Sequence, residues 1–223
     1  TYAQKYGTTA VQTSATVLPT RTIYGFDCGP VALELSFVAP LLLDDLDLIS
    51  RPVNYIAYAV NAKDGQKHDV SIRIEAGAEW AQNYPMDEVA VSETFEKNGI
   101  TYARTGNIDQ TILSRSGDNV RIDWGYFYLA AESQGTAASA LPAGDVAIER
   151  TLGRVKKGDG KIMIGYDDLY SIRYFGTDLR PWWNSDGTKT IEGEFEAACR
   201  DYKAIMKRSC GFDASMMAEA AAA

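Results

Sequence analysis

The sequence is poor in the residues that most often carry metal and nucleophilic chemistry. It contains one histidine and three cysteines among 223 residues, and no Cys-x-x-Cys spacing. With so few Cys and His side chains as possible ligands, the sequence excludes a zinc site of the usual Cys and His type. We expect no disulfide between Cys199 and Cys210, which stand eleven positions apart. We expect neither a bound metal nor a cofactor.

Positive charge is also scarce. The chain has 22 Lys and Arg against 30 Asp and Glu, a formal net charge of −8. A nucleic-acid-binding protein normally presents a basic surface, so we expect no nucleic-acid partner. No apolar run approaches the roughly 20 residues that span a bilayer, so we expect no membrane span. The chain starts at Thr1 without a leader pattern, and we expect a mature or trimmed piece of a longer protein.

Strand patterns fill the first two-thirds of the chain. Apolar and polar residues alternate within five runs, at 8–18, 20–29, 31–40, 53–60 and 68–80. Turn residues separate later runs: Asp64-Gly65 and Asn98-Gly99 predict hairpins, and 114–119 predicts a further turn. Short strands joined by short turns indicate an antiparallel β-sandwich.

The pattern changes after residue 132. Residues 132–145 are small and weakly patterned, which favours a loop or linker, and 146–155 suggests one more strand pair. Residues 190–210 have helical spacing; we expect Gly211 to end that helix and Asp213 to cap a second one. The predicted organisation is a β-sandwich at 1–150, a linker or last strand at 151–164, and a truncated helical-hairpin domain at 165–223.

Three ordered blocks resemble the glutaminase A family, whose members are known from fungi and gut Bacteroidetes. They are Gln12–Ile72 with "DDLDLISRPVNY", Gly117–Ala130 with "GDNVRIDWGYFYLA", and "GYDDLYSIRYFGTDLRPWW" from Gly165. The resemblance implies a mainly β, antiparallel supersandwich of the galactose-mutarotase-like type that leads into an α/α toroid. It also implies a secreted or periplasmic protein that hydrolyses L-glutamine to glutamate and ammonia. The long helical part of the family does not follow Ala223, and the linker is shorter than usual.

The stretch from Gly165 to Thr188 is the best candidate site. It concentrates acids, arginines and aromatic rings: Asp167, Asp168, Arg173, Arg180, Trp182, Trp183 and Asn184. Arginine can hold a carboxylate through two parallel hydrogen bonds, and tryptophan can stack on a sugar or line a small pocket. The same composition suits a junction between a sandwich and a helical domain. The sequence leaves both interpretations open, with an amino acid or a sugar as substrate.

Other candidate groups have simpler interpretations. Asp44, Asp45 and Asp47 are expected to cap a turn or pair with Arg51, with a calcium site as the alternative. His68, beside the predicted turn, is expected to form a local hydrogen bond rather than act as a base.

Two further segments carry groups that chemistry could use. Cys28 is a nucleophile only in principle, because no partner histidine is apparent in the sequence. Arg121 and Asp123 are expected to pair on one face of a strand, with Trp124 in the core.

Three functions remain open at this level. The chain can be a scaffold and pocket wall of a glutaminase-type hydrolase, part of a glycoside hydrolase-like enzyme, or a non-catalytic module that binds carbohydrate or protein. No serine-hydrolase elbow is present, so we expect the chain alone to be inactive. We also expect some self-association, because a helical hairpin without its neighbours exposes an apolar face.

Overall fold

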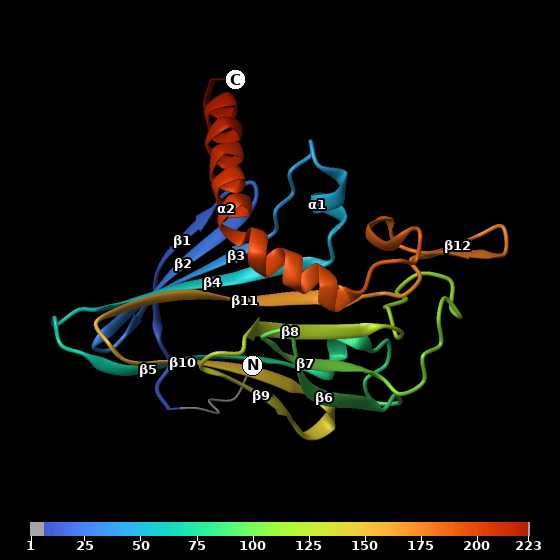
Figure 1. Cartoon of the computed structure of the whole chain (residues 1–223), viewed down its shortest axis with the longest axis horizontal. Coiled ribbons are helices and arrows are strands. Elements are labelled where there is room, and N and C mark those ends of the chain that lie inside the picture. Colours follow the sequence, from blue (N-terminus) through green and yellow to red (C-terminus); the bar gives the residue numbers. More distant parts are fainter. Residues whose placement is uncertain (1–6, 223) are drawn as a thin grey trace.

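The computed structural model describes residues 7–222, and its dominant feature is an eight-stranded antiparallel sheet (Figure 1). Its order is β1-β2-β3-β4-β11-β8-β7-β6. The strands are β1 (Val11–Val17), β2 (Arg21–Cys28), β3 (Val31–Val38), β4 (Val53–Ala62), β6 (Ala90–Lys97), β7 (Ile100–Asn107), β8 (Tyr126–Glu132) and β11 (Lys157–Asp167). The chain is mainly β, as the alternating runs predict.

A second, smaller sheet lies against part of the first. Its order is β5-β10-β9, with β5 (His68–Ala76), β9 (Thr136–Ala140) and β10 (Val146–Val155). A separate hairpin pairs β12 (Ile172–Tyr174) with β13 (Thr177–Leu179) and projects from the body (Figure 1). The helical elements are α1 (Leu46–Ser50), η1 (Ala78–Ala81), η2 (Pro142–Gly144), η3 (Trp182–Asn184) and α2 (Ile191–Ala222).

Both faces of the large sheet are buried near its middle. Along β8, Tyr128 and Ala130 pack into the core beneath α2, whereas Phe127 and Leu129 pack into the core shared with the small sheet. Successive side chains of a strand point to opposite faces, so a strand covered on both sides has few polar positions. This explains the nearly continuous apolar run at 126–131.

The C-terminal segment is a single helix, which makes the expected helix pair wrong. α2 runs through Gly211 and Asp213 without a break to Ala222. Gly211 does not have the positive φ of a helix-ending glycine, and Asp213 bonds to the β1–β2 turn instead of capping a new helix. The first part of α2 lies across the large sheet, and its last turns extend beyond it (Figure 1).

Two predicted turns have different outcomes. Lys97 pairs with Ile100 across Asn98 and Gly99, both at positive φ, so the second hairpin is confirmed as a tight primed turn. The Asp64-Gly65 hairpin is wrong, because β4 and β5 belong to different sheets. The turn there carries the chain from one sheet to the other.

The weakly patterned region is more regular than expected. Residues 136–140 form β9, and 146–155 form one long strand rather than a pair. The interval 151–164 holds the end of β10 and most of β11, the strand alternative of our prediction. Small residues suit β9 because it runs along the edge of a three-stranded sheet. No helix within residues 7–222 is both long and apolar enough to cross a bilayer.

Candidate functional site

The two adjacent acids at the end of β11 make separate local contacts. Asp167 Oδ1 accepts a hydrogen bond from the Leu169 backbone N–H at 3.1 Å, and Asp168 Oδ2 accepts one from the Ser171 hydroxyl at 2.5 Å. Burial raises the pKa of Asp167; the Leu169 N–H opposes that rise, and the nearby charges of Asp168 and Glu192 add to it. A half-buried carboxyl with a raised pKa is typical of a functional site, although structural clusters produce it too.

Arg173 is committed to its own hairpin. Its Nε and Nη2 donate to the two carboxylate oxygens of Asp178 at 2.6 and 3.0 Å, across the β12–β13 pair. Its Nη1 donates to the Leu113 carbonyl at 3.3 Å. This two-point pairing holds the pKa of Asp178 below its usual value. Arg173 therefore has little capacity left for a ligand.

Arg180 is the arginine of this stretch that remains free to bind an anion. Its guanidinium carbon lies 4.9 Å from the centre of the Tyr170 ring, and its Nη2 reaches the Tyr170 hydroxyl at 3.5 Å. Within residues 7–222 it forms no ion pair with a carboxylate. Its positive charge acts on Asp167 by lowering the pKa of that carboxyl, so the two groups lie within electrostatic range.

The two tryptophans of η3 have opposite environments. Trp183 is 3% exposed and belongs to the core beneath α2, whereas Trp182 is 60% exposed. Asn184 Oδ1 accepts a hydrogen bond from the Lys189 backbone N–H at 2.9 Å, which fixes the approach to α2. Of these three predicted site residues, only Trp182 presents its side chain to solvent.

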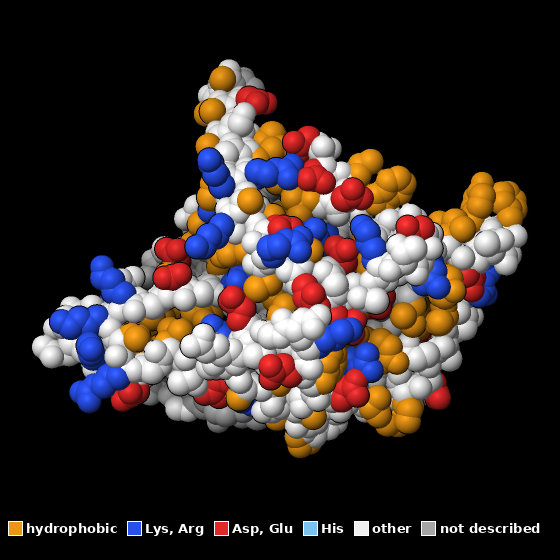
Figure 2. All heavy atoms as spheres, in the orientation of Figure 1, with side chains coloured by type: hydrophobic (Ala, Val, Ile, Leu, Met, Phe, Trp, Pro, Cys, Tyr) orange, Lys and Arg blue, Asp and Glu red, His pale blue; other side chains and the backbone are white. Residues whose placement is uncertain are grey.

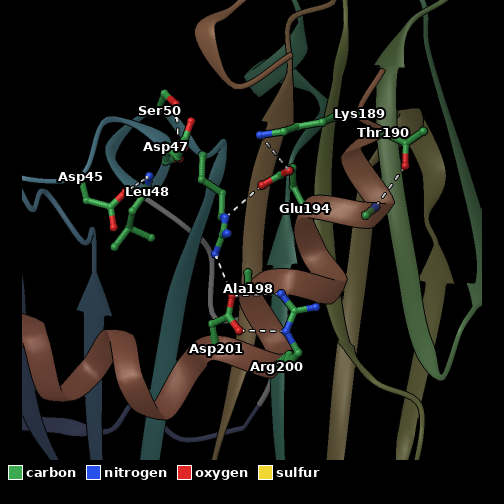
Figure 3. A network of polar contacts seen from close by, with 12 residues as sticks. Asp45, Asp47, Leu48, Ser50, Lys189, Thr190, Glu194, Ala198, Arg200 and Asp201 are labelled. Atoms are coloured by element: carbon green, nitrogen blue, oxygen red, sulfur yellow. Dashed lines mark hydrogen bonds and ion pairs between the residues drawn. The ribbon is translucent and has the colours of Figure 1, made fainter. Parts of the chain in front are cut away.

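Ion pairs and packing dock the first turns of α2 (Figure 3). Glu194 accepts a hydrogen bond from Arg51 Nε at 3.0 Å and lies 3.9 Å from Lys189 Nζ. The Tyr55 hydroxyl donates to the Ala198 carbonyl at 3.0 Å, and Phe195 is fully buried against the sheet. Arg51 is thus paired with α2, and not with the nearby acids as we expected.

Those acids instead reach the middle of α2. Asp45 caps α1 by accepting from the Leu48 backbone N–H at 3.0 Å, which confirms the capping role. The Arg208 guanidinium donates to Asp45 at 2.7 Å and to Asp44 at 3.2 Å. The Arg208 hydrogen bond lowers the pKa of Asp45.

A polar shelf beside the start of α2 escaped sequence reasoning. We use this name for the side chains that neighbouring strands place on the α2 face of the sheet: Glu93, Arg104, Tyr126, Tyr128 and Asp167. Arg104 pairs with Glu93, donates to the Tyr128 hydroxyl at 3.2 Å and lies 4.5 Å from the Tyr126 ring centre. Burial raises the pKa of Tyr128 to about 12. These residues share no motif, and only strand register brings them together.

Loop 108–125 closes the site from the side. The Trp124 indole Nε1 donates to the carbonyls of Asp168 and Tyr170 at 2.8 and 3.1 Å. A Cβ on Gly125 would lie 2.1 Å from the Asp167 carbonyl oxygen, so only glycine fits there. Trp124 is half-buried rather than in the core. The expected Arg121–Asp123 pair is wrong: Asp123 is buried and pairs with Arg115 Nε at 2.9 Å.

The remaining reactive side chains lie at the other end of the sandwich. His68 Nε2 is 3.0 Å from Asp64 Oδ1, which confirms its local role. His68 and Cys28 line the same cavity of about 470 Å³, a proximity that the sequence does not reveal, although the structure, which describes both residues, shows no hydrogen bond between them. Partial desolvation, then Asp27, raises the pKa of the Cys28 thiol, which disfavours the nucleophilic thiolate. All three cysteines are unpaired.

The described residues form no candidate metal centre. Residues 7–222 contain no group of three His, Cys, Asp or Glu side chains that could hold a metal ion. We call residues 165–188 the seam. The seam contains one free guanidinium (Arg180), one half-buried carboxyl (Asp167) and one exposed indole (Trp182). These groups can bind and orient a small zwitterion or a sugar, but the amide-cleaving nucleophile is not among them.

Comparison with known families assigns most of the chain to one family. The family model described as "Domain of unknown function (DUF5127)" matches residues 20–146 and 142–219, most of the chain. The chain belongs to the DUF5127 family. This DUF5127 chain is also 26% identical, over 187 residues, to the glutaminase A of Aspergillus oryzae (strain ATCC 42149 / RIB 40). That alignment covers 81% of the chain and 26% of the relative, so the chain spans about a quarter of the relative's length.

The DUF5127 chain is also similar to a solved structure. It is described as a candidate kojibiose phosphorylase from the human microbiome, and it matches 86% of this chain and 22% of its own. The TM-score is 0.42 and the sequence identity 8%. An overlap of this degree is too low to support an argument about fold or function.

Proposed function

We propose that this chain is the N-terminal β-domain of a glutaminase A-like hydrolase, which converts L-glutamine to L-glutamate and ammonia. The observation that carries the proposal is the similarity to the Aspergillus oryzae glutaminase A over 81% of the chain. The proposal includes a following helical domain that supplies the catalytic acid and base. It also includes a secreted or periplasmic location, which fractionation of the source cells tests.

In this proposal the seam forms one wall of the substrate pocket. Arg180 has no carboxylate partner within residues 7–222, so its guanidinium is available for the α-carboxylate of glutamine. Asp167 lies within its electrostatic range and offers an acceptor for the α-ammonium group. The exposed Trp182 ring covers the aliphatic part of the substrate. Arg173, Trp183 and Asn184 are structural, because each already has its partners.

The apolar surface beside α2 is where we place the contact with the following domain. Leu42, Leu43 and Phe212 contribute to a groove of about 690 Å³ between the α1 loop and α2. Leu43 is 72% exposed, which is unfavourable for a surface that stays in water. We expect the isolated chain to self-associate through this groove. Light scattering measures this, and Leu43→Lys should return a monomer.

Ammonia release from L-glutamine tests the function. The full polypeptide that the gene encodes should release ammonia, whereas residues 1–223 alone should bind substrate weakly and release none. Release of sugar from glycans by the full polypeptide, with no ammonia, would replace this proposal with a glycoside hydrolase-like function. If the full polypeptide releases neither ammonia nor sugar, the remaining interpretation is a non-catalytic binding module.

A further inference from the structure

The connection between β7 and β8 is unusually long and rigidly held. Residues 108–125 contain no helix or strand, whereas most connections in compact domains have about 4–6 residues. Leu113 and Asn119 hold positive φ values of 50° and 61°, a strained conformation for residues with a side chain. Long ordered loops with local strain are found mainly at functional sites.

A polar cluster, buried at Asp123 and Asn83 but 40% exposed at the Arg115 side chain, joins this loop to the neighbouring loop 82–89. Arg115 Nε lies 2.9 Å from Asp123 Oδ2, and Arg115 Nη2 lies 3.5 Å from Glu88 Oε1. Asn83 Oδ1 accepts a hydrogen bond from the Arg121 backbone N–H at 2.9 Å. Asp123 is 1% exposed and Asn83 is 3% exposed. Ion pairs such as those of Arg115 add little net stability, but they fix the relative position of the two loops.

The two loops enclose a cleft of about 700 Å³, which we call the two-loop cleft. Its walls are formed by Asn83, Tyr84, Pro85, Met86, Asp87, Asn119, Val120 and Arg121. Tyr84 is 54% exposed, and the Arg115 guanidinium carbon lies over its ring, 5.5 Å from the ring centre. Asp87 and Arg121 form no ion pair within the part of the chain that the structure describes. Their donors and acceptors are therefore available to a ligand.

This lining specifies the chemistry of the ligand. An aromatic face packs against the C–H face of a pyranose ring, while planar carboxylate, amide and guanidinium groups bond pairs of neighbouring hydroxyls. The opposite charges of Asp87 and Arg121 cancel, which disfavours a polyanion as the ligand. L-glutamine is much smaller than the cleft and presents no ring to Tyr84.

We propose that the two-loop cleft binds a neutral saccharide. The cleft is separate from the seam, because its lining residues belong to loops 82–89 and 108–125 and include none of residues 165–188. This inference goes beyond the glutaminase-type function and does not rest on it. A glycan held here would tether the protein to a carbohydrate surface whatever reaction the full polypeptide performs.

Titration of the ¹⁵N-labelled chain with glucose, maltose, cellobiose and chitobiose tests the proposal. At least one of these probes should produce saturable amide shifts at 83–87 and 119–121. Tyr84→Ala should weaken binding about tenfold by removing the stacked ring, and Arg121→Ala should weaken it to a similar extent. Both variants should fold, because the Tyr84 ring is exposed and the Asn83 bond uses the Arg121 backbone N–H.

Tyr174→Ala is the matched control, since Tyr174 is also an exposed ring, 61% exposed, but lies on the β12–β13 hairpin. Figure 2 shows the apolar side chains of that projecting hairpin at one edge of the molecule. The control should keep wild-type saccharide affinity. The proposal is overturned if no probe binds saturably, if Tyr84→Ala binds as wild type, or if L-glutamine rather than a sugar shifts the cleft amides.

Discussion

The Asp213 carboxylate of α2 accepts three hydrogen bonds from the β1–β2 turn. The Thr20 backbone N–H and hydroxyl each donate at 2.8 Å to Oδ1, and Arg21 Nε donates at 2.7 Å to Oδ2. Asp213 is 2% exposed and lies 193 positions from Thr20 in the sequence. One buried carboxylate therefore ties the far half of α2 to the edge of the large sheet.

Asp213→Ala should destabilise the fold by about 3 kcal/mol, because it leaves the Arg21 guanidinium and the Thr20 N–H without their partner. Denaturant unfolding measures the loss, and hydrogen exchange should increase first at 205–213. Met217→Ala, on an exposed position of the same helix, should change stability by less than about 0.5 kcal/mol. Equal effects for both variants would remove the special role of Asp213.

Gly211→Ala should stabilise the protein by about 0.5–1 kcal/mol. Gly211 lies inside a continuous helix, its φ is not positive, and an added Cβ meets no atom within 4 Å. Thermal unfolding checks the sign. Gly99→Ala, at φ 76°, should destabilise instead. Destabilisation by Gly211→Ala would restore the expectation that the helix ends there.

Arg180→Ala and Arg173→Ala should separate binding from structure. In the full polypeptide, Arg180→Ala should raise the KM for glutamine about tenfold or more with little change in unfolding temperature, because its guanidinium has no internal carboxylate partner. Arg173→Ala should loosen the hairpin that Asp178 holds and leave KM nearly unchanged. Identical kinetics for the wild type and Arg180→Ala would make the seam purely structural.

Asp167→Asn should raise stability at neutral pH. Burial raises the folded pKa of Asp167, so the ionised carboxylate is less stable in the folded than in the unfolded protein. That penalty grows as pH rises through the unfolded pKa of about 3.9 and is complete above the folded pKa. The gain from Asn should therefore vanish below about pH 4, which urea unfolding at several pH values measures.

Asp178→Asn should change stability at neutral pH in the opposite direction from Asp167→Asn. Arg173 depresses the pKa of Asp178, so its stabilisation is present above about pH 4 and is lost as pH falls through the folded pKa. Asp178→Asn should consequently lower stability at pH 7. If both Asn variants shifted stability in the same direction, the electrostatic account of the seam would be wrong.

Local sequence determined the elements that depend on local physics. Alternation predicted the early strands, and Asn98-Gly99 predicted its turn because both residues tolerate positive φ. Helical spacing predicted the start of α2. The helix end was wrong because glycine is a weak signal when a distant partner, Thr20, binds the next polar residue.

Tertiary structure alone decided which polar groups are free. The sequence shows Arg173 and Arg180 as equivalents, but only strand pairing places Asp178 against Arg173 and leaves Arg180 open. Register across four strands assembled the polar shelf, and loops 82–89 and 108–125 together formed the two-loop cleft. Apart from the Arg173–Asp178 pair, such contacts join positions far apart in the sequence, and no local pattern encodes which of the possible partners meets which. The sequence by itself determined the early strands and the first turns of α2, whereas the fold decided which side chains remain available to a ligand.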